Sequence, residues 1–215
     1  MTNATQHCGL YAVVEAGPGA SERLAAALAA GDIAVALIVP GAGATLDAGG
    51  AKPLVDMAQR ADTAALLADN WDLAHALRAD GVHLTSAPGI AASYAQARHA
   101  LGAGGIVGVD AGISRHDAMS LAEAGADYIA FAAPARLKER DKARMRRNEL
   151  VAWWGEIFEV PCVAFDVENA DEAEALCRAG ADFVAVTLAA AQPPAAAHDL
   201  IAAVASRLRA PQGAD

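Results

Sequence analysis

The chain has 215 residues, 55% of them apolar, and a formal net charge of −10. This length fits one domain of barrel size, and the apolar share is enough for a large core. The negative charge argues against non-specific binding to nucleic acid, and an aromatic share of 5% argues against a surface that stacks bases. A small molecule is therefore the expected ligand.

The N-terminal stretch and the cysteines bear on localisation. No basic region precedes the first apolar run, and no stretch of about 20 apolar residues is free of Gly, Pro and charge, so neither a secretory signal nor a membrane span is expected. Cys8, Cys162 and Cys177 lack metal-like spacing, and Cys162 and Cys177, which stand in a strand and a helix pattern, are expected to be buried thiols. Their odd number favours a reducing compartment, and the cytoplasm is the predicted location.

One helix-to-strand pattern recurs along the chain. Leu66–Leu84 reads as an apolar strand, a short helix and a second apolar strand, which is one step of a parallel sheet. Leu121–Phe131 and Ala175–Val186 repeat its second half. In each repeat an alanine-rich helix ends at a glycine, Gly125 or Gly180, which adopts the left-handed conformation at low cost.

The whole chain divides into alternating strands and helices. The predicted strands are Leu10–Val14, Ile33–Val39, Ala64–Ala68, Val82–Leu84, Ile106–Val109, Tyr128–Ala132, Cys162–Phe165 and Phe183–Thr187. The predicted helices are Ser21–Ala30, Pro53–Arg60, Trp71–Leu77, Ile90–Leu101, Ser114–Ala124, Arg144–Phe158, Ala170–Arg178 and Pro194–Leu208. Such regular alternation predicts a small single-domain (β/α)₈ TIM barrel over residues 1–210, followed by a tail at 211–215.

Local signals mark several boundaries. Ser21, Ser114 and Asn169 are expected to cap the helices that follow them, because their side-chain oxygens accept hydrogen bonds from free backbone N–H groups. The Gly-rich segment Pro40–Lys52 is expected to be a loop.

Acidic residues follow the odd-numbered strands. They are Glu15, Asp69, Asp110 and Asp166. Active sites of (β/α)₈ barrels lie at the C-terminal ends of the strands, and alternate strands contribute to one layer of side chains, so these four acids could converge. Converging carboxylates need a divalent metal, a cationic ligand or raised pKa values. The alternative is that each acid caps a helix or faces solvent in its own loop.

The segment after the sixth strand is strongly basic. Ala135–Asn148 holds seven of the 16 basic residues, at Arg136, Lys138, Arg140, Lys142, Arg144, Arg146 and Arg147. These side chains could close over a phosphate or pyrophosphate. Equally, they could satisfy neighbouring Glu and Asp side chains on a solvated helix start.

Other candidates are weaker. His83 stands near a strand end and is expected to be a hydrogen-bonded structural histidine rather than a catalyst. His75 and His99 are expected to face solvent from helices. Trp153–Trp154 is typical of a core or a subunit interface, which leaves a homodimer open. The glycines form no dinucleotide-binding fingerprint.

The residues resemble a known family. LLADNWDLAHALRADGVHL resembles the third-strand to fourth-strand segment of thiamine phosphate synthase, usually written with Asn-Asp-Arg and Asp-Gly-Val-His-Leu-Gly-Gln. The similarity continues through IVGVDAGISRHDAMSLAEAGADYIAF, VPCVAF and AGADFVAV, covers most of residues 60–190, and is looser at CGLYAVV. The resemblance implies a small barrel that joins an aminopyrimidine pyrophosphate to a thiazole phosphate. It also implies Mg²⁺, a carbocation-like intermediate and release of pyrophosphate.

The family's site residues are largely replaced. Its Gln-Leu-Arg/Lys after strand two falls on Ala36–Ile38, and its Asn-Asp pair falls on Asp69–Asn70 in reversed order. Its Gly-Gln-Glu-Asp after strand four becomes Thr85–Pro88, and its phosphate-cradling Gly-Gly after strand seven becomes Asp166–Val167. The related thiazole tautomerases place a histidine near the position of Gly112.

Three functions remain open. The first is a synthase in which Asp69, Asn70 and the Lys138–Lys142 segment do rearranged work. The second is a divergent barrel enzyme in which Asp69, Asp110 and Asp166 bind a metal or an amine. The third is a non-catalytic protein that binds a metabolite or regulates a partner.

The predicted site follows from these alternatives. Asp69, Asn70, Asp110 and Asp166 are the catalytic candidates, and Asp69 with Asp110 could hold Mg²⁺. The anion-binding candidates are Arg136, Lys138, Arg140, Lys142 and Thr187. Synthase activity is predicted to be weak or absent.

Overall fold

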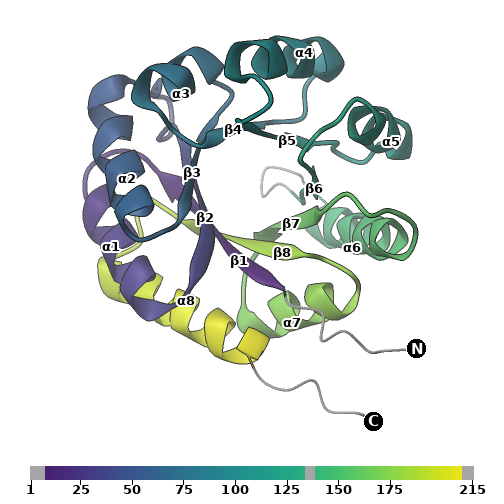
Figure 1. Ribbon diagram of the computed structural model, residues 1–215. Coiled ribbons are helices and arrows are strands. Elements are labelled where there is room, and N and C mark those ends of the chain that lie inside the picture. Colours follow the sequence, from purple (N-terminus) through teal and green to yellow (C-terminus); the bar gives the residue numbers. More distant parts are fainter. Residues whose placement is uncertain (1–7, 134–138, 210–215) are drawn as a thin grey trace.

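The computed structural model describes residues 8–133 and 139–209 and is a closed barrel of parallel strands ringed by helices (Figure 1). The strands are β1 (Gly9–Glu15), β2 (Ile33–Val39), β3 (Ala64–Ala68), β4 (Gly81–Leu84), β5 (Ile106–Asp110), β6 (Tyr128–Phe131), β7 (Cys162–Val167) and β8 (Phe183–Leu188). The helices are α1 (Ala20–Ala30), α2 (Ala48–Arg60), α3 (Trp71–Leu77), α4 (Ile90–Leu101), α5 (Arg115–Glu123), α6 (Arg140–Ile157), α7 (Ala170–Arg178) and α8 (Pro194–Arg209). The strands pair in chain order and β8 closes onto β1, which confirms the predicted (β/α)₈ barrel.

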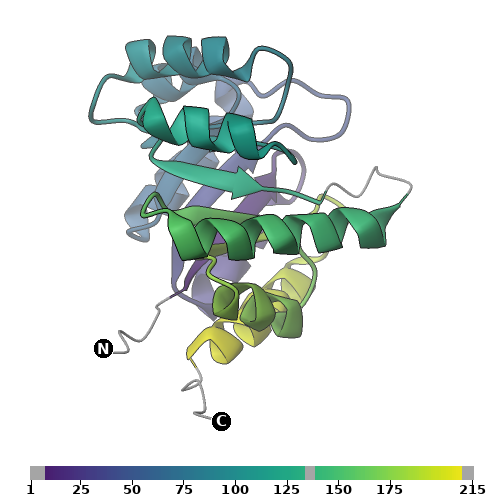
Figure 2. The same ribbon diagram turned by 90° about the vertical axis from the view of Figure 1, so that its right-hand side faces the viewer.

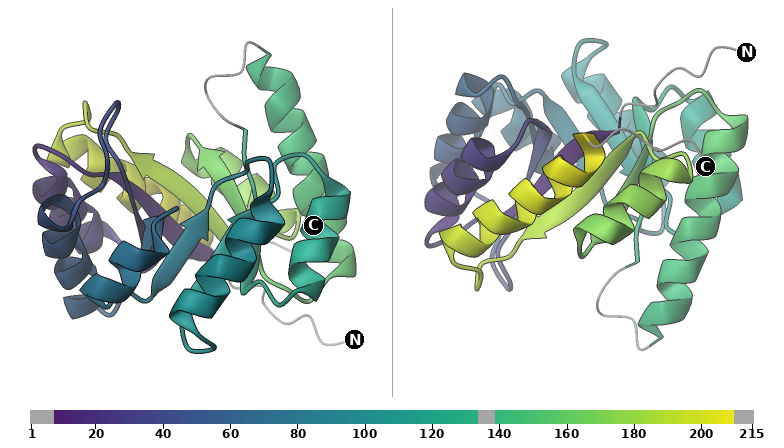
Figure 3. Two further views of the ribbon diagram at one scale, coloured as in Figure 1. Left: turned by 90° about the horizontal axis from the view of Figure 1, so that it is seen from above. Right: turned by 90° about the horizontal axis from the view of Figure 1, so that it is seen from below.

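The helices cover the outside of the strands on all sides. Figure 2 shows α6, which has 18 residues, running across one side of the barrel. The views from above and below show the strands lengthwise with helices on either side of them (Figure 3). No helix in the described ranges is long and apolar enough to cross a membrane.

Several helix starts differ from the predicted ones, and α6 begins at Arg140, four residues before the predicted Arg144. Ser21 does not cap α1, because Gly19 holds the N-cap position at φ 72° with no side-chain hydrogen bond. α2 begins at Ala48, inside the predicted loop, because the Asp47 carboxylate accepts a hydrogen bond from Gly50 N at 2.8 Å. Ser114 and Asn169 do cap α5 and α7, as predicted.

The recurring Asp before a strand has a structural role. Asp80, Asp127 and Asp182 each accept a hydrogen bond of 2.7–2.8 Å from a backbone N–H near the start of the neighbouring, earlier strand. The donors are Ala65 of β3, Val107 of β5 and Cys162 of β7. Each carboxylate therefore satisfies a backbone donor at the N-terminal end of the barrel, which explains why the pattern repeats.

The core between strands and helices contains the tryptophan cluster. Trp154 is fully buried, stacks on Phe158 and donates its indole N–H to the Val160 carbonyl at 2.7 Å. Trp153 is half-buried, and the Arg115 guanidinium lies 4.5 Å from the centre of its ring. Trp154 is thus a core residue, as one of the two interpretations predicted, and the homodimer stays a prediction.

The cysteines correct the sequence-based interpretation. Cys8, just before β1, forms a disulfide with Cys177 of α7, 169 residues away. The expectation of a buried thiol at Cys177 is therefore wrong, and the odd number of cysteines no longer indicates a reducing compartment. Cys162 is a free, buried thiol, and burial raises its pKa.

Candidate functional site

The predicted site residues lie at the mouth, which we define as the C-terminal ends of the strands and the loops that follow them. Side chains alternate along each strand between the inside of the barrel and the helices. Tyr11, His83, Tyr128 and Phe165 contact one another within the barrel, beneath the mouth. We call these four side chains the floor.

The floor is joined by hydrogen bonds and ring stacking. The Tyr11 and Tyr128 hydroxyls are 2.9 Å apart, and His83 Nδ1 is 2.9 Å from the Tyr128 hydroxyl. The His83 ring stacks on Phe165 with ring centres 4.7 Å apart. Gly108 makes room for this arrangement, because a Cβ there would lie 1.9 Å from the Tyr128 ring. The four side chains are only 0–8% exposed, so they pack against one another and support the mouth from beneath.

Burial sets the protonation of the floor. His83 is 2% exposed, and burial lowers its pKa to about 3. Burial likewise raises the pKa of Tyr11 and of Tyr128. At neutral pH the imidazole is uncharged and both hydroxyls keep their protons. This confirms His83 as a buried, hydrogen-bonded histidine, and His75 and His99 are exposed on their helices, as predicted.

Asp69 is bound to the loop after the next strand. Its carboxylate accepts hydrogen bonds from Thr85 N at 2.8 Å and Thr85 Oγ1 at 2.7 Å. Its backbone has φ 52°, in the left-handed region. The Asn70 side chain caps α3 by accepting a hydrogen bond from Leu73 N at 3.0 Å. The pair Asp69–Asn70 therefore joins β3 to the β4 loop and starts α3.

The other three acids also bind backbone N–H groups of loops. Glu15 accepts a hydrogen bond from Ala190 N at 2.6 Å, and Asp110 accepts one from Gly112 N at 2.8 Å. Asp166, at φ 57°, accepts one from Ala133 N at 2.9 Å. Asp110 thus binds its own loop, whereas Glu15, Asp69 and Asp166 each bind the loop after another strand, so neither interpretation of the four acids describes them fully. Within the described ranges, no three His, Cys, Asp or Glu side chains could together hold a metal ion.

A magnesium ion would have to be shared with a ligand. Mg²⁺ is commonly held by one or two carboxylates together with substrate phosphate oxygens. Asp69 is exposed at the mouth, and each of its oxygens has a second lone pair beyond the bond to Thr85. Asp69 therefore fits one protein ligand of such an ion, and the paired site with Asp110 stays a prediction.

The basic segment is neutralised where the structure describes it. Arg140 and Arg144 pair with Glu168, Lys142 pairs with Glu139 at 2.7 Å, and Arg146 pairs with Glu149 at 3.1 Å. These contacts match the interpretation of a solvated helix start. Arg136 and Lys138 lie outside the described residues. Thr187 is half-buried on β8 and pairs with Val13 of β1.

Two buried arginines lie at the mouth, and the sequence-based reasoning named Arg147 only as part of the basic segment and did not name Arg23. Arg147 is fully buried, pairs with Glu172 at 2.6 Å and donates to the carbonyls of Phe165 and Asp166 at 2.8 and 3.1 Å. Burial opposes ionisation of Glu172, but hydrogen bonds from Glu168 N and Arg147, with the charges of Arg147 and Arg144, give it a lowered pKa. Arg23 is the second buried arginine.

The spacing of buried residues along each helix could have identified both arginines as buried. Arg147 precedes the buried residues Leu150, Val151 and Trp154 at i+3, i+4 and i+7, so it shares their inward face. Arg23 stands in the buried stripe of α1 in the same way. The floor residues Tyr11, Tyr128 and Phe165 follow the inward alternation of their strands.

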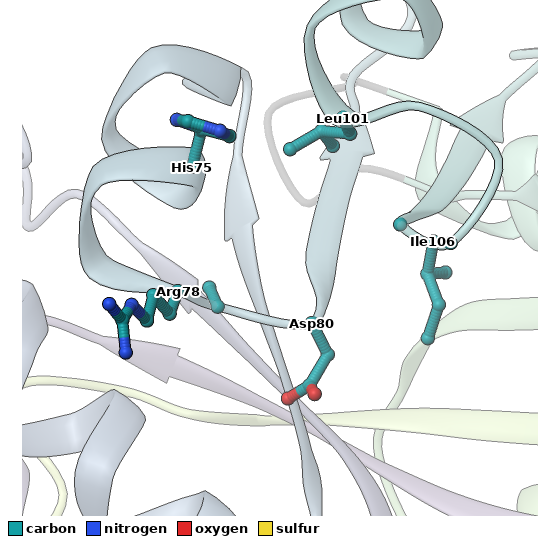
Figure 4. A pocket seen from close by; sticks show the side chains of 8 residues that line it. His75, Arg78, Asp80, Leu101 and Ile106 are labelled. Carbon is teal, nitrogen blue, oxygen red and sulfur yellow. The ribbon is translucent and has the colours of Figure 1, made fainter.

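A cavity of about 480 Å³ lies at the other end of the barrel, where β4 and β5 begin (Figure 4). His75, Arg78 and Asp80 line it, and their side chains point in different directions rather than toward a common centre. In barrels of this class the N-terminal end serves stability and the C-terminal end carries chemistry. The mouth is therefore the candidate active site.

The chain is similar to proteins of thiamine biosynthesis. A family model described as thiamine monophosphate synthase matches residues 10–190. A thiamine-phosphate synthase of Erythrobacter litoralis is 42% identical over 139 residues, 64% of this chain and 64% of that protein. One of Rhodospirillum centenum is 40% identical over 164 residues, 76% of this chain and 78% of that protein. The matched region thus spans less than two thirds of the first relative.

Solved structures show the same fold. Thiamine phosphate pyrophosphorylase from Pyrococcus furiosus has a TM-score of 0.71 at 21% identity, covering 96% of this chain and 98% of that one. A native KDPGal structure has a TM-score of 0.74 at 12% identity.

Proposed function

Because the chain belongs to the thiamine monophosphate synthase family, we propose that it is a barrel of thiamine biosynthesis with weak or absent synthase activity. The reaction would join an aminopyrimidine carried as its pyrophosphate to a thiazole phosphate and release pyrophosphate. Both substrates bring phosphate groups to the mouth. The residues that would hold those anions decide the rate.

The observation that carries this proposal is Asp166. It occupies the place where the resemblance puts a phosphate-cradling Gly-Gly, and its φ of 57° is in the region that favours glycine. The backbone there has the conformation suited to a glycine, but a carboxylate projects from it. A carboxylate repels a phosphate, so this part of the mouth opposes the anion that a glycine pair would cradle.

The second strand supports the same conclusion. The family's pyrophosphate-binding polar residues fall on Ala36, Leu37 and Ile38, which are all buried in β2. Aliphatic side chains cannot donate hydrogen bonds to a pyrophosphate. The basic residues Arg140 and Arg144 are paired with Glu168, so an anion would have to compete with that carboxylate.

Other parts of the site suit the proposed substrates. Asp69 fits one protein ligand of a Mg²⁺ ion shared with a substrate phosphate, and the buried floor supports the mouth beneath it. When bound, Mg²⁺ would neutralise charge on the leaving pyrophosphate. Asp69 would orient that ion, with Thr85 holding the carboxylate in place. The buried floor would exclude water from beneath the ligand.

The test is a direct comparison of rates. Purified protein and the Rhodospirillum centenum relative are each given both substrates with Mg²⁺, and thiamine phosphate is measured. The proposal predicts a rate lower by at least about 100-fold, which corresponds to about 2.7 kcal/mol of lost transition-state stabilisation. Rates that agree within about tenfold would overturn it.

A second candidate is a divergent enzyme or a non-catalytic protein that binds a planar metabolite. The Asp166 carboxylate and the pairing of Arg140 and Arg144 with Glu168 both oppose an anion at the mouth and so favour it. Calorimetry separates the two: the aminopyrimidine without its pyrophosphate should bind at least as tightly as the pyrophosphate form under this candidate. Titration with Mg²⁺, Mn²⁺ and amines tests the acidic residues Asp69, Asp110 and Asp166.

A further inference from the structure

Arg23 of α1 connects two loops of the mouth that are far apart in the chain. Its side chain donates hydrogen bonds to the carbonyl oxygens of Glu15 at 2.8 Å, Pro18 at 3.0 Å and Ala190 at 3.3 Å. Glu15 and Pro18 belong to the end of β1 and the loop after it, and Ala190 belongs to the loop after β8. One guanidinium therefore holds both loops at the seam where the barrel closes.

Glu15 completes the connection from the other side. Its carboxylate accepts a hydrogen bond from Ala190 N at 2.6 Å. Both backbone groups of Ala190, its N–H and its C=O, are thus bound by side chains from β1 and α1. A loop residue held at both groups has little freedom to shift.

The burial of Arg23 is costly and needs a reason. Arg23 is 2% exposed, and within the described part of the chain its guanidinium forms no ion pair with a carboxylate. Burying a charge without a partner of opposite charge is unfavourable, and an apolar side chain would fill this position of α1 more cheaply. What an apolar side chain cannot do is bind three carbonyl oxygens of two loops at once.

We propose that Arg23 is a positioning residue of the mouth, which fixes the loops after β1 and β8 relative to each other. The loops of the C-terminal face form the site in barrels of this class, so their placement controls how a ligand is held. The effect of Arg23 on substrate binding rests on the function proposed above. The effect of Arg23 on the two loops is independent of that function.

The chain offers a matched control at the opposite end of the barrel. Arg98 of α4 donates to the carbonyls of Gly102 at 3.0 Å and Gly105 at 2.7 Å and pairs with Asp127. Arg98 thus also joins loops through carbonyl oxygens, but at the end where β5 and β6 begin. Arg23→Met and Arg98→Met each remove a loop-binding guanidinium and keep a long side chain.

The first measurement needs no substrate. Backbone hydrogen exchange is followed residue by residue in the full chain at one temperature below all melting transitions. In Arg23→Met the Ala190 amide should exchange at least about tenfold faster than in wild type, and in Arg98→Met it should not change. Arg23→Lys should fall between, because one ammonium group cannot reach both loops. An unchanged Ala190 amide in Arg23→Met and Arg23→Lys would overturn the proposal.

The second measurement links the loops to the site. With both substrates and Mg²⁺, kcat/KM in Arg23→Met should be at least about tenfold below that of Arg98→Met, and Arg23→Lys should restore part of it. Equal values in the two Met variants would show that Arg23 is merely structural. Absent turnover in wild type agrees with the proposed function, and only a failure to bind the aminopyrimidine with or without its pyrophosphate by calorimetry would overturn it. In either case the exchange of Ala190 still decides whether Arg23 fixes the loops.

Discussion

The Asp166 carboxylate accepts a hydrogen bond from the backbone N–H of Ala133 at 2.9 Å, and so joins the end of β7 to the loop after β6. Asp69 makes the equivalent contact between β3 and the loop after β4. Both residues have a left-handed backbone. The acids of the mouth therefore hold neighbouring loops, and their charge remains at the place where phosphate-bearing substrates would bind.

The buried His83 makes stability depend on pH. Its pKa is about 3 in the folded protein against 6.5 for an ordinary histidine, so between these values only the unfolded chain takes up the proton. Stability therefore falls as pH falls below 6.5, by about 2 kcal/mol at pH 5. Urea denaturation of wild type and His83→Gln from pH 7.5 to pH 5 measures this. The variant should lose that part of the pH dependence, with His99→Gln on α4 as the control. Parallel curves for wild type and His83→Gln would contradict the assignment.

The buried ion pair of Arg147 with Glu172 should be essential for stability. Arg147→Met leaves a nearly buried carboxylate short of a partner and two carbonyls of β7 without their donor. We expect a loss of about 3 kcal/mol. The neighbouring Arg146→Met removes only an exposed pair with Glu149 and should cost less than about 1 kcal/mol. Chemical denaturation of both variants measures the change in the free energy of unfolding. Similar losses in the two variants would show that the buried pair stabilises the fold no more than the exposed pair does.

The disulfide between Cys8 and Cys177 closes a loop of nearly the whole chain. Its reduction should cost about 2–4 kcal/mol, because the crosslink restricts the unfolded chain. Alkylation under denaturing conditions without reductant should label one thiol, Cys162, and labelling after reduction should reach three. Cys8→Ser should match reduced wild type in thermal stability. Labelling of three thiols without reductant would refute the bond.

The sequence predicted the barrel well because each strand and helix is encoded locally. Ile33–Val39 is an unbroken apolar run, and Asn169 caps α7 with its own side chain. Ser21 was a wrong cap because Gly19 adopts the left-handed conformation at the start of α1, which the Ser pattern does not reveal. Local patterns therefore located the strands and helices, whereas the N-caps of α1 and α2 were missed although their partners lie a few residues away.

The contacts of the site depend on distant partners. The bond of Glu15 to Ala190 and the disulfide of Cys8 with Cys177 each join residues from opposite ends of the chain. The four acids could be placed at the mouth from the strand pattern, but which loop each one binds follows from the packing of neighbouring strands. Arg23 and Arg147 look like surface residues unless helical spacing is considered.

Replacement of Asp166 by glycine tests the central claim most directly. Asp166→Gly removes the carboxylate and suits the left-handed backbone, and Asp62→Gly is the matched control, because Asp62 is exposed with φ 58° at the turn after α2. Thiamine phosphate formation with both substrates and Mg²⁺ is measured for wild type and both variants. The account predicts a rise of at least about tenfold in kcat/KM for Asp166→Gly alone, equivalent to about 1.4 kcal/mol. An unchanged or lower value in Asp166→Gly would contradict it.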